Sequence, residues 1–217
     1  KETDIEGNAQ RYVPTYERFT EERRFEPLVQ NYFEQYLGQF PAQVFDRINE
    51  NFIRCSFFEL CSRYLSSYYT FAIEQNNSAG RSDFEMTGIP GTDYYKDDRL
   101  VEFKYFKAKE AERMLALSDP RPEDVAQVLA YAKDTKEKFP YYHVRSYIVY
   151  ICANKGWKCW EVIRDINPIA LLIVLCGAND VPCYWHSCAT MLARPYHLDG
   201  KGVPLRWHTH ATVMARS

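Results

Sequence analysis

Three strand-like segments with short connections constrain the fold of this chain more than any other feature of its sequence. The segments are predicted over residues 69–75, 81–87 and 100–106. A turn signal at 76–80 separates the first two, and a polar loop over 88–99 leads to the third. Successive strands with short connections usually pair with their neighbours as an antiparallel meander. We therefore expect a three-stranded antiparallel sheet at the centre of the fold.

Helical patterns flank this meander in the sequence. Apolar side chains recur at three- and four-residue steps from residue 46 to 68, which predicts an amphipathic helix. Further helices are predicted over 108–117 and 123–138, with Pro122 acceptable in the first turn of the second one. Two more strands are predicted, at 144–153 and 157–163, joined by a tight turn. This order of elements predicts one α/β domain over residues 46–166.

The two terminal segments differ from this pattern. Residues 1–45 are polar, with aromatic side chains at irregular spacing, and we expect a linker or the end of a preceding domain. Residues 167–217 contain four of the five histidines but only two acidic residues. The cysteine and histidine spacings there match no standard zinc site. We expect an anomalous tail that is either not native, for example frame-shifted translation, or poorly ordered.

Charge, hydropathy and cysteine content narrow the class of protein. The net charge of −2 argues against a generally basic nucleic-acid-binding protein but allows a local basic groove. We find neither an apolar run of membrane-spanning length nor a signal-peptide pattern, and we expect a cytoplasmic location without a membrane partner. The seven cysteines form no Cys-x-x-Cys pair, so free thiols are expected rather than a disulfide framework.

Charged residues on the second and third predicted strands form a candidate metal site. Glu102 and Lys104 lie two residues apart on one strand, so their side chains leave the same face. Asp83 lies on the preceding strand, where hairpin-like pairing can bring it beside Glu102. Carboxylate oxygens suit Mg²⁺, which takes its other ligands from water and substrate phosphate. A metal lowers the pKa of its bound water, and Lys104 can orient that water or stabilise negative charge.

Three further residues are candidates for the same site. Glu50 falls on the apolar stripe of the first predicted helix, where a charge is costly unless it is paired or bound to metal. The alternative for Glu50 is a helix N-terminal acid favoured by the macrodipole. Gln127 and Tyr131 lie one turn apart on one helix face, where they can hydrogen-bond a phosphate or Lys104. Tyr131 is alternatively part of the apolar core.

Other acidic residues near these strands are expected at the surface. Glu74 lies close in sequence to Asp83, but we expect it to form a surface salt bridge. Asp93, Asp97 and Asp98 fall in the predicted polar loop and are expected to be solvated.

The combined pattern resembles the PD-(D/E)XK nuclease superfamily over residues 46 to 162. Within it, the chain is most similar to the branch of RecB-type nuclease domains, and to the nuclease-like domains at the C-terminus of bacterial AAA-ATPase-like proteins. Ser82 stands where the first family motif nominally has proline. The residues that carry the resemblance are Glu50, Gly80-Arg81-Ser82-Asp83, Glu102-Phe103-Lys104 and Gln127-x-x-x-Tyr131.

The resemblance implies a restriction-endonuclease-like core and a Mg²⁺-dependent nuclease of DNA, with Mn²⁺ as an alternative ion. It also implies an ATPase-like domain, whose end residues 1–45 would form. Two alternatives stay open: a catalytically inactive nucleic-acid-binding module, and a regulatory interaction domain for the ATPase-like partner. In the implied site Asp83, Glu102 and Glu50 bind the metal, Lys104 is the catalytic lysine, and Gln127 and Tyr131 support it.

Overall fold

The computed structural model of the protein describes residues 3–77 and 80–163. The chain divides into two units, Lys1–Ala170 and Leu171–Ser217, and the described residues lie in the first. The anomalous tail expected over 167–217 lies outside the described residues, as does the side chain of Glu74. In the described part of the chain, no helix is long and apolar enough to cross a membrane.

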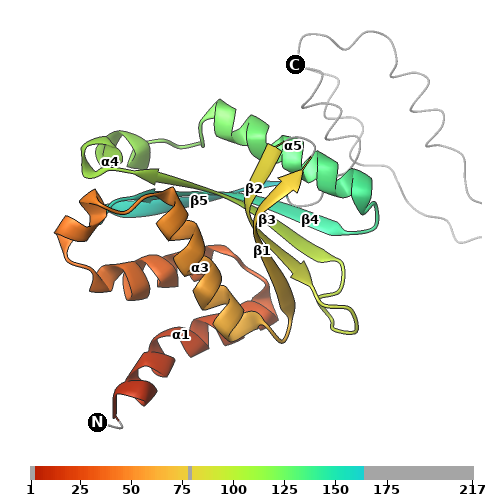
Figure 1. The fold of residues 1–217 in the computed structure, drawn as a ribbon, viewed down its shortest axis with the longest axis horizontal. Helices are drawn as coiled ribbons and strands as arrows, with labels where there is room; N and C mark the ends of the chain where they lie inside the picture. Colours follow the sequence, from red (N-terminus) through yellow and green to blue (C-terminus); the bar gives the residue numbers. More distant parts are fainter. Residues whose placement is uncertain (1–2, 78–79, 164–217) are drawn as a thin grey trace, which may run out of the picture. The chain divides into compact units, whose positions relative to one another are not determined.

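A five-stranded sheet in the order β1-β2-β3-β4-β5 forms the centre of the first unit (Figure 1). The strands are β1 (Tyr69–Asn77), β2 (Gly80–Gly88), β3 (Asp97–Phe106), β4 (His143–Cys152) and β5 (Gly156–Ile163). The main helices are α1 (Thr3–Glu22), α2 (Glu26–Asn31), α3 (Glu50–Leu65), α4 (Ala108–Leu115) and α5 (Pro122–Lys138). Three short helical segments join α2 to α3: η1 (Tyr32–Tyr36), η2 (Leu37–Gln39) and η3 (Ala42–Asp46).

The pairing of the strands confirms the predicted meander. β1 pairs antiparallel with β2, and β2 with β3. β4 then pairs parallel with β3, because α4 and α5 form the crossover between them. β5 returns antiparallel to β4 through the predicted tight turn. The structure therefore has the α/β architecture expected from the order of elements, and it is consistent with the restriction-endonuclease-like core that the resemblance implies.

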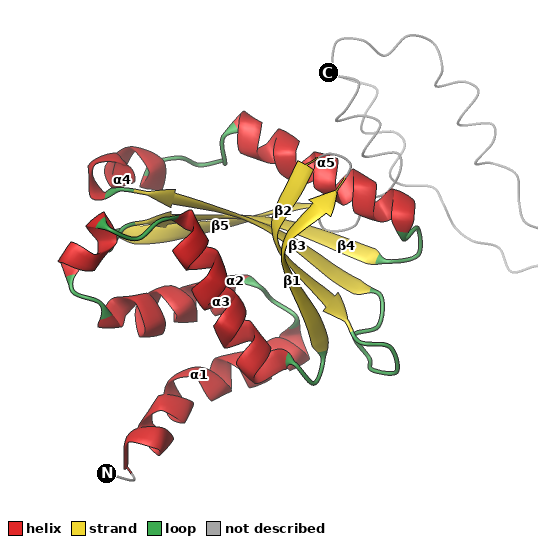
Figure 2. Cartoon of the chain, in the orientation of Figure 1, coloured by secondary structure: helices red, strands yellow, loops and turns green. Residues whose placement is uncertain are grey.

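Helices cover both faces of the sheet (Figure 2). One face of β3 carries Val101 and Phe103 into a large core shared with α1, α2 and α3. The other face carries Phe106 into a smaller core with side chains from α4 and α5, including Met114 and Val128. This alternation follows from the two-residue period of a strand. Glu102 and Lys104 have the same parity as Phe106, so they belong to the α4/α5 face.

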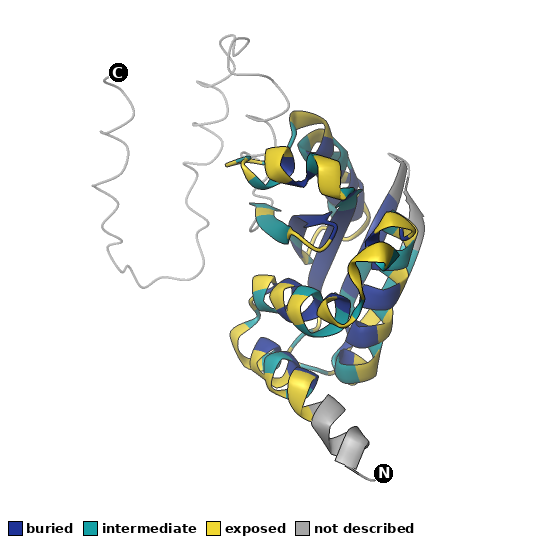
Figure 3. Cartoon of the chain, turned by 90° about the vertical axis from the view of Figure 1, so that its left-hand side faces the viewer, coloured by how far each residue is buried: buried dark blue, intermediate teal, exposed yellow. Residues whose placement is uncertain are grey.

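The N-terminal segment is part of this core rather than a linker. Tyr16 and Phe19 of α1 are each only 2% exposed, and Phe25 stacks on Tyr147 of β4 with ring centroids 4.5 Å apart. Phe25 also meets Phe57 of α3 edge to face. The segment has no core of its own because its aromatic side chains complete a core that α3 and the sheet begin. Figure 3 shows the resulting pattern, with buried residues between helices whose outer faces are exposed.

Asp97 and Asp98 are buried, which contradicts the expectation of a solvated loop. β3 begins at Asp97, and the side chains of Asp97, Asp98 and Arg99 are 5%, 3% and 0% exposed. The Arg99 guanidinium bonds to Asp97 Oδ2 at 2.9 Å, and the Tyr69 hydroxyl donates to the same oxygen at 2.7 Å. The charges of Asp97 and Arg99 are tolerated inside because the two side chains pair with each other. Asp98 has a weaker partner, the Thr87 hydroxyl, which donates from Oγ1 at 2.9 Å.

Candidate active site

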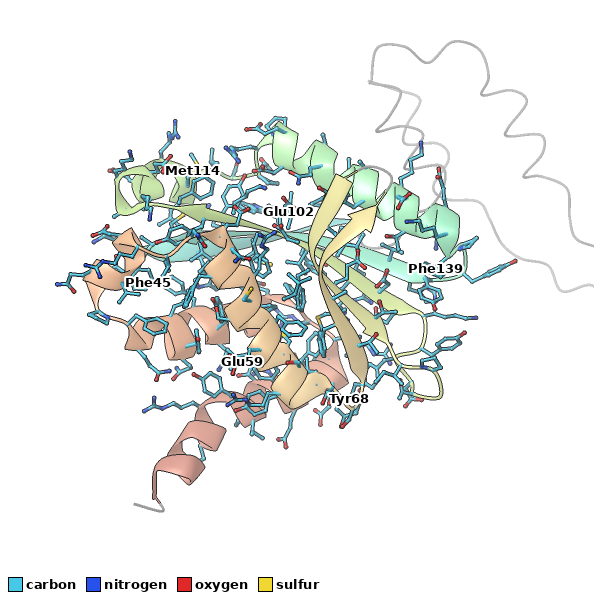
Figure 4. All side chains as sticks on the ribbon, viewed as in Figure 1. Phe45, Glu59, Tyr68, Glu102, Met114 and Phe139 are labelled. Carbon is cyan, nitrogen blue, oxygen red and sulfur yellow. The ribbon has the colours of Figure 1, made fainter. Side chains whose placement is uncertain are left out.

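The candidate residues lie where β2 parts from β3. The recorded pairing between these strands ends at Phe84↔Val101, although both strands continue beyond it. The next residue on each strand is a carboxylate, Asp83 on β2 and Glu102 on β3. Opposed residues of antiparallel strands point to the same face, so the two carboxylates share one side of the fork. Figure 4 shows Glu102 near the middle of the sheet, between the level of α3 and that of α5.

Asp83 is held by one cation and one backbone amide. Arg54 Nη1 of α3 lies 2.5 Å from Asp83 Oδ1, and the Phe103 N–H donates to Oδ2 at 2.9 Å. The pair is largely shielded from solvent, with the Arg54 and Asp83 side chains 13% and 7% exposed. Because the amide comes from the residue next to Glu102, this bond fixes Asp83 against the strand that carries the other carboxylate.

Glu102 is the most deeply buried acid of the group. It is 1% exposed, and Lys104 Nζ lies 2.5 Å from its Oε1. Its Oε2 is buried without a hydrogen-bond partner among the described residues. Burial and the nearby charge of Asp83 together raise the pKa of Glu102 to about 7, although Lys104 acts in the opposite direction. The unpaired Oε2 leaves Glu102 able to bind a further cation, which would favour its carboxylate form.

Lys104 keeps its charge in this setting. Burial opposes the ammonium form, but the bond to Glu102 and the charges of Glu50 and Asp83 outweigh it, so the pKa of Lys104 is raised. The Lys104 side chain is 18% exposed and therefore reaches the solvent-accessible edge of the site. A cation in that position can contact a substrate phosphate and a water beside it.

Glu50 lies at the edge of the same group, at the first position of α3. Burial raises its pKa, and the Lys104 charge lowers it while Asp83 raises it. The backbone N–H of Tyr105 on β3 also hydrogen-bonds to it. Glu50 is therefore a helix N-terminal acid and also a neighbour of the candidate metal site, because the start of α3 lies at the fork. Its assignment as a metal ligand stays a prediction.

Gln127 and Tyr131 lie on α5, the helix that packs chiefly against β4 and also contacts β3 and β2. Gln127 Nε2 donates to the Tyr131 hydroxyl at 2.7 Å, so the two side chains form the pair expected from their spacing. Tyr131 is 4% exposed, which agrees with the reading of this residue as part of the helix's buried face. Support of the site by this pair stays a prediction.

Arg54 is the charged residue at the fork that the sequence analysis missed. It lies four residues after Glu50, so the two side chains leave α3 from the same face. This spacing is the signal that could have identified it. An arginine on a helix is normally interpreted as part of a solvated face.

The donor set suits a divalent metal, but the carboxylates are engaged with other partners. Within the described residues, no three histidine, cysteine or acidic side chains lie in an arrangement ready to hold a metal ion. The reason is visible in the contacts, because Asp83 binds Arg54 and Glu102 binds Lys104. The unpaired Glu102 oxygen and the nearby Asp83 and Glu50 fit Mg²⁺ chemistry, which uses few protein carboxylates. Loading would require Arg54 to move from Asp83.

The comparison with protein families decides the class of this fold. The family model of the PD-(D/E)XK nuclease superfamily matches residues 48–161 of the chain. The chain belongs to this superfamily. The matched residues run from just before α3 to β5, and they include every candidate site residue.

Comparisons with individual proteins add little to the assignment. No curated protein matches the chain. Among solved structures, that of SSO0001 is similar at 12% sequence identity, with a TM-score of 0.35, over 86% of this chain and 83% of the other. The superfamily generally comprises nucleases, which act on nucleic acids, so the predicted resemblance to this superfamily is confirmed.

Proposed function

We propose that this PD-(D/E)XK protein hydrolyses DNA phosphodiester bonds with the help of a divalent cation, Mg²⁺ or alternatively Mn²⁺. The observation that carries the proposal is the buried Glu102 beside Asp83 at the β2/β3 fork, with one unpaired oxygen and Lys104 on the same face. In this proposal Asp83 and Glu102 bind the metal, and Glu50 contributes from the start of α3.

In this proposal each residue at the fork has its own role. Asp83 and Glu102 would bind the divalent ion that neutralises the phosphate. Their positions on strands suit this role, since strands hold side chains more precisely than loops do. Lys104 would donate to a non-bridging oxygen of the attacked phosphate and hold the water in line with the phosphorus, because its ammonium reaches the edge of the site. When bound, a divalent ion neutralises the phosphate and lowers the pKa of a coordinated water. Gln127 and Tyr131 would orient the same phosphate from α5.

The Arg54–Asp83 ion pair favours a second candidate, a nucleic-acid-binding module without activity. Arg54 Nη1 at 2.5 Å satisfies Asp83 Oδ1 without any metal, as a structural ion pair would. In that case the domain binds DNA, or regulates the ATPase-like partner that the family resemblance implies, and divalent ions do not bind at the fork.

A nuclease assay separates the two candidates. Labelled DNA is incubated with Mg²⁺ or Mn²⁺ and with the wild type, Asp83→Asn or Lys104→Ala; Lys109→Ala, at an exposed position of α4, serves as the matched control. We expect each site variant to lose activity by about a hundredfold or more, as for removal of a transition-state contact. Cleavage that survives both site substitutions would exclude this site. DNA binding without cleavage by the wild type would favour the inactive module.

We also propose a cytoplasmic setting and an AAA-ATPase-like partner domain, with the RecB-type branch as the nearest part of the superfamily. The cysteines in the described part of the chain support a reducing compartment, because Cys55, Cys61, Cys152 and Cys159 are free thiols. Co-purification of the full-length protein with ATPase activity would test the partner.

A further inference from the structure

Exposed aromatic side chains gather at the end of the sheet where β3 and β4 begin. Among the described side chains, the exposed large hydrophobic ones are Tyr95, Phe139 and Tyr141, at 46%, 47% and 79% exposure. They lie in two loops, one before β3 and one between α5 and β4. We call these three residues, together with Tyr142 and Lys96, the aromatic platform. Exposed apolar groups that cluster in this way usually mark a binding surface.

The sheet holds the two loops of the platform side by side. The parallel pairing of β3 and β4 begins at Asp97↔His143, and the His143 N–H donates to the Lys96 carbonyl at 2.7 Å. Lys136 of α5 donates from Nζ to the Tyr142 carbonyl at 2.5 Å. The rings are therefore carried by a backbone that the sheet and α5 fix in place.

The rings and the lysine form one continuous surface. Phe139 stacks on Tyr142 with centroids 4.9 Å apart, and Tyr95 meets Tyr142 at 6.3 Å. Lys96 Nζ lies 5.4 Å from the centre of Tyr95 and 6.0 Å from that of Tyr141. Such distances allow a cation–π contact. Lys96 adopts a φ of 71°, which a lysine rarely takes, and this backbone turn is what directs the ammonium across the rings.

This chemistry matches an unpaired nucleic-acid strand. Bases stack on exposed aromatic faces whatever their sequence, while nearby cations follow the phosphates. The last turn of α5 adds Lys136, whose Nζ is bound to the neutral Tyr142 carbonyl, beside the platform. Lys138 is paired with Asp134 at 2.6 Å. Lys96 and Lys136 are therefore the cations of this surface. The platform therefore offers π-faces and positive charge together, as single-strand-binding proteins do.

The platform also lies at a useful distance from the candidate active site. Six residues of β3 separate Lys96 from Glu102, a span of about 20 Å for a strand. Twelve residues of α5 separate Gln127 from Phe139, about 18 Å for a helix. Figure 4 shows Phe139 at the end of α5 and Glu102 near the middle of the sheet. One unpaired strand of a few nucleotides can span such an interval.

We propose that the aromatic platform docks the unpaired bases of a DNA strand whose phosphodiester lies at the β2/β3 fork, about 20 Å away along β3. This inference rests on the proposed nuclease function, but it makes a separate statement about where the strand runs. The platform would supply affinity and direction without sequence preference, because stacking uses the faces of the bases rather than their edges.

Equilibrium binding in EDTA tests the platform without cleavage. The anisotropy of a fluorescein-labelled 15-nucleotide oligo(dT) is measured with the wild type, Tyr141→Ala, the double variant Phe139→Ala/Tyr141→Ala, and Tyr141→Phe as the matched control. We expect Tyr141→Ala to weaken binding about fivefold or more, as for the loss of one base–aromatic stack. The double variant should lose more, and Tyr141→Phe should stay within about twofold because it keeps the ring.

Two further measurements distinguish stacking from other roles. A blunt 15-base-pair duplex hides its base faces, so its affinity should be the same for the wild type and Tyr141→Ala. An oligo(dT) carrying one 5-iodouracil should crosslink to the peptide that contains residues 139–142. If the wild type binds the oligonucleotide but Tyr141→Ala does so equally well, the platform is wrong and the proposed function survives. If the wild type does not bind the oligonucleotide in EDTA, the platform is wrong, whereas the proposed function is decided by the cleavage assay with Mg²⁺ or Mn²⁺.

Discussion

The ion pair between Arg54 and Asp83 should set the affinity of the proposed site for divalent metal. Its nitrogen and oxygen lie 2.5 Å apart, and both side chains are largely buried. Removing one partner of a fully buried pair costs about 3–5 kcal/mol. Since this pair keeps some solvent contact, we expect Arg54→Gln to lower the stability of the metal-free protein by about 2 kcal/mol. At the size of this unit, that corresponds to a melting temperature lower by about 4–8 °C.

The same variant should bind metal more tightly. In the wild type a metal has to displace the guanidinium from Asp83, and in Arg54→Gln it does not. If the full 2 kcal/mol or so is recovered on loading, the dissociation constant for Mn²⁺ falls about 25-fold. Isothermal titration calorimetry measures this directly, and the Mn²⁺-dependent rise in melting temperature gives an independent value.

Arg63→Gln is the matched control, because it lies on the same helix and pairs with Glu59 at 2.8 Å. That pair is exposed, so its loss should change stability by less than about 1 kcal/mol and leave metal affinity unchanged. The reasoning is refuted if Arg54→Gln binds Mn²⁺ no more tightly than the wild type does. Loss of Mn²⁺ binding in this variant would refute it equally, since Arg54 would then help to build the site.

Two further predictions concern buried polar groups. Burial raises the pKa of Asp98 from 3.8 to about 7, so its contribution to stability is present below pH 3.8 and lost as the pH rises through 7. Asp98→Asn should therefore stabilise the protein at pH 8 by up to about 4 kcal/mol and have little effect at pH 4, as measured by urea unfolding; equal effects at both pH values would contradict this. Gln127→Ala and Tyr131→Phe remove the same hydrogen bond, so the double variant should cleave DNA no more slowly than the slower single variant. Additive losses would mean that the two side chains act separately.

The meander and the positions of its acids could be predicted because strands have a short, local signature. Alternation places Glu102 and Lys104 on one face whatever else the chain does. The start of β3 could not be predicted in this way, because Asp97, Asp98 and Arg99 form the kind of charged run that normally marks a loop. Their burial depends on Tyr69 and Thr87, which come from other strands, and no local pattern reveals such partners.

The N-terminal helices show the same limit at a larger scale. Phe25 becomes a core residue only because Phe57 and Tyr147 come to it from α3 and β4. Irregular aromatic spacing is what a segment shows when it fills gaps in another element's core instead of forming its own. The matched family region begins at residue 48, so the family pattern gives no help there either.

The charges at the fork explain why metal and substrate would bind together. Three carboxylates, Asp83, Glu102 and Glu50, lie at the fork; burial raises the pKa of Glu102 and of Glu50, and the charge of Asp83 raises both further. Arg54 and Lys104 balance two of these charges, so a divalent ion would make the site positive unless Arg54 withdraws. A phosphate that arrives with the metal changes this balance, because it gives both the ion and the released guanidinium a negative partner. Arg54 would then move from Asp83 to the substrate phosphate. The net charge of the site would stay small before and after the metal and phosphate bind.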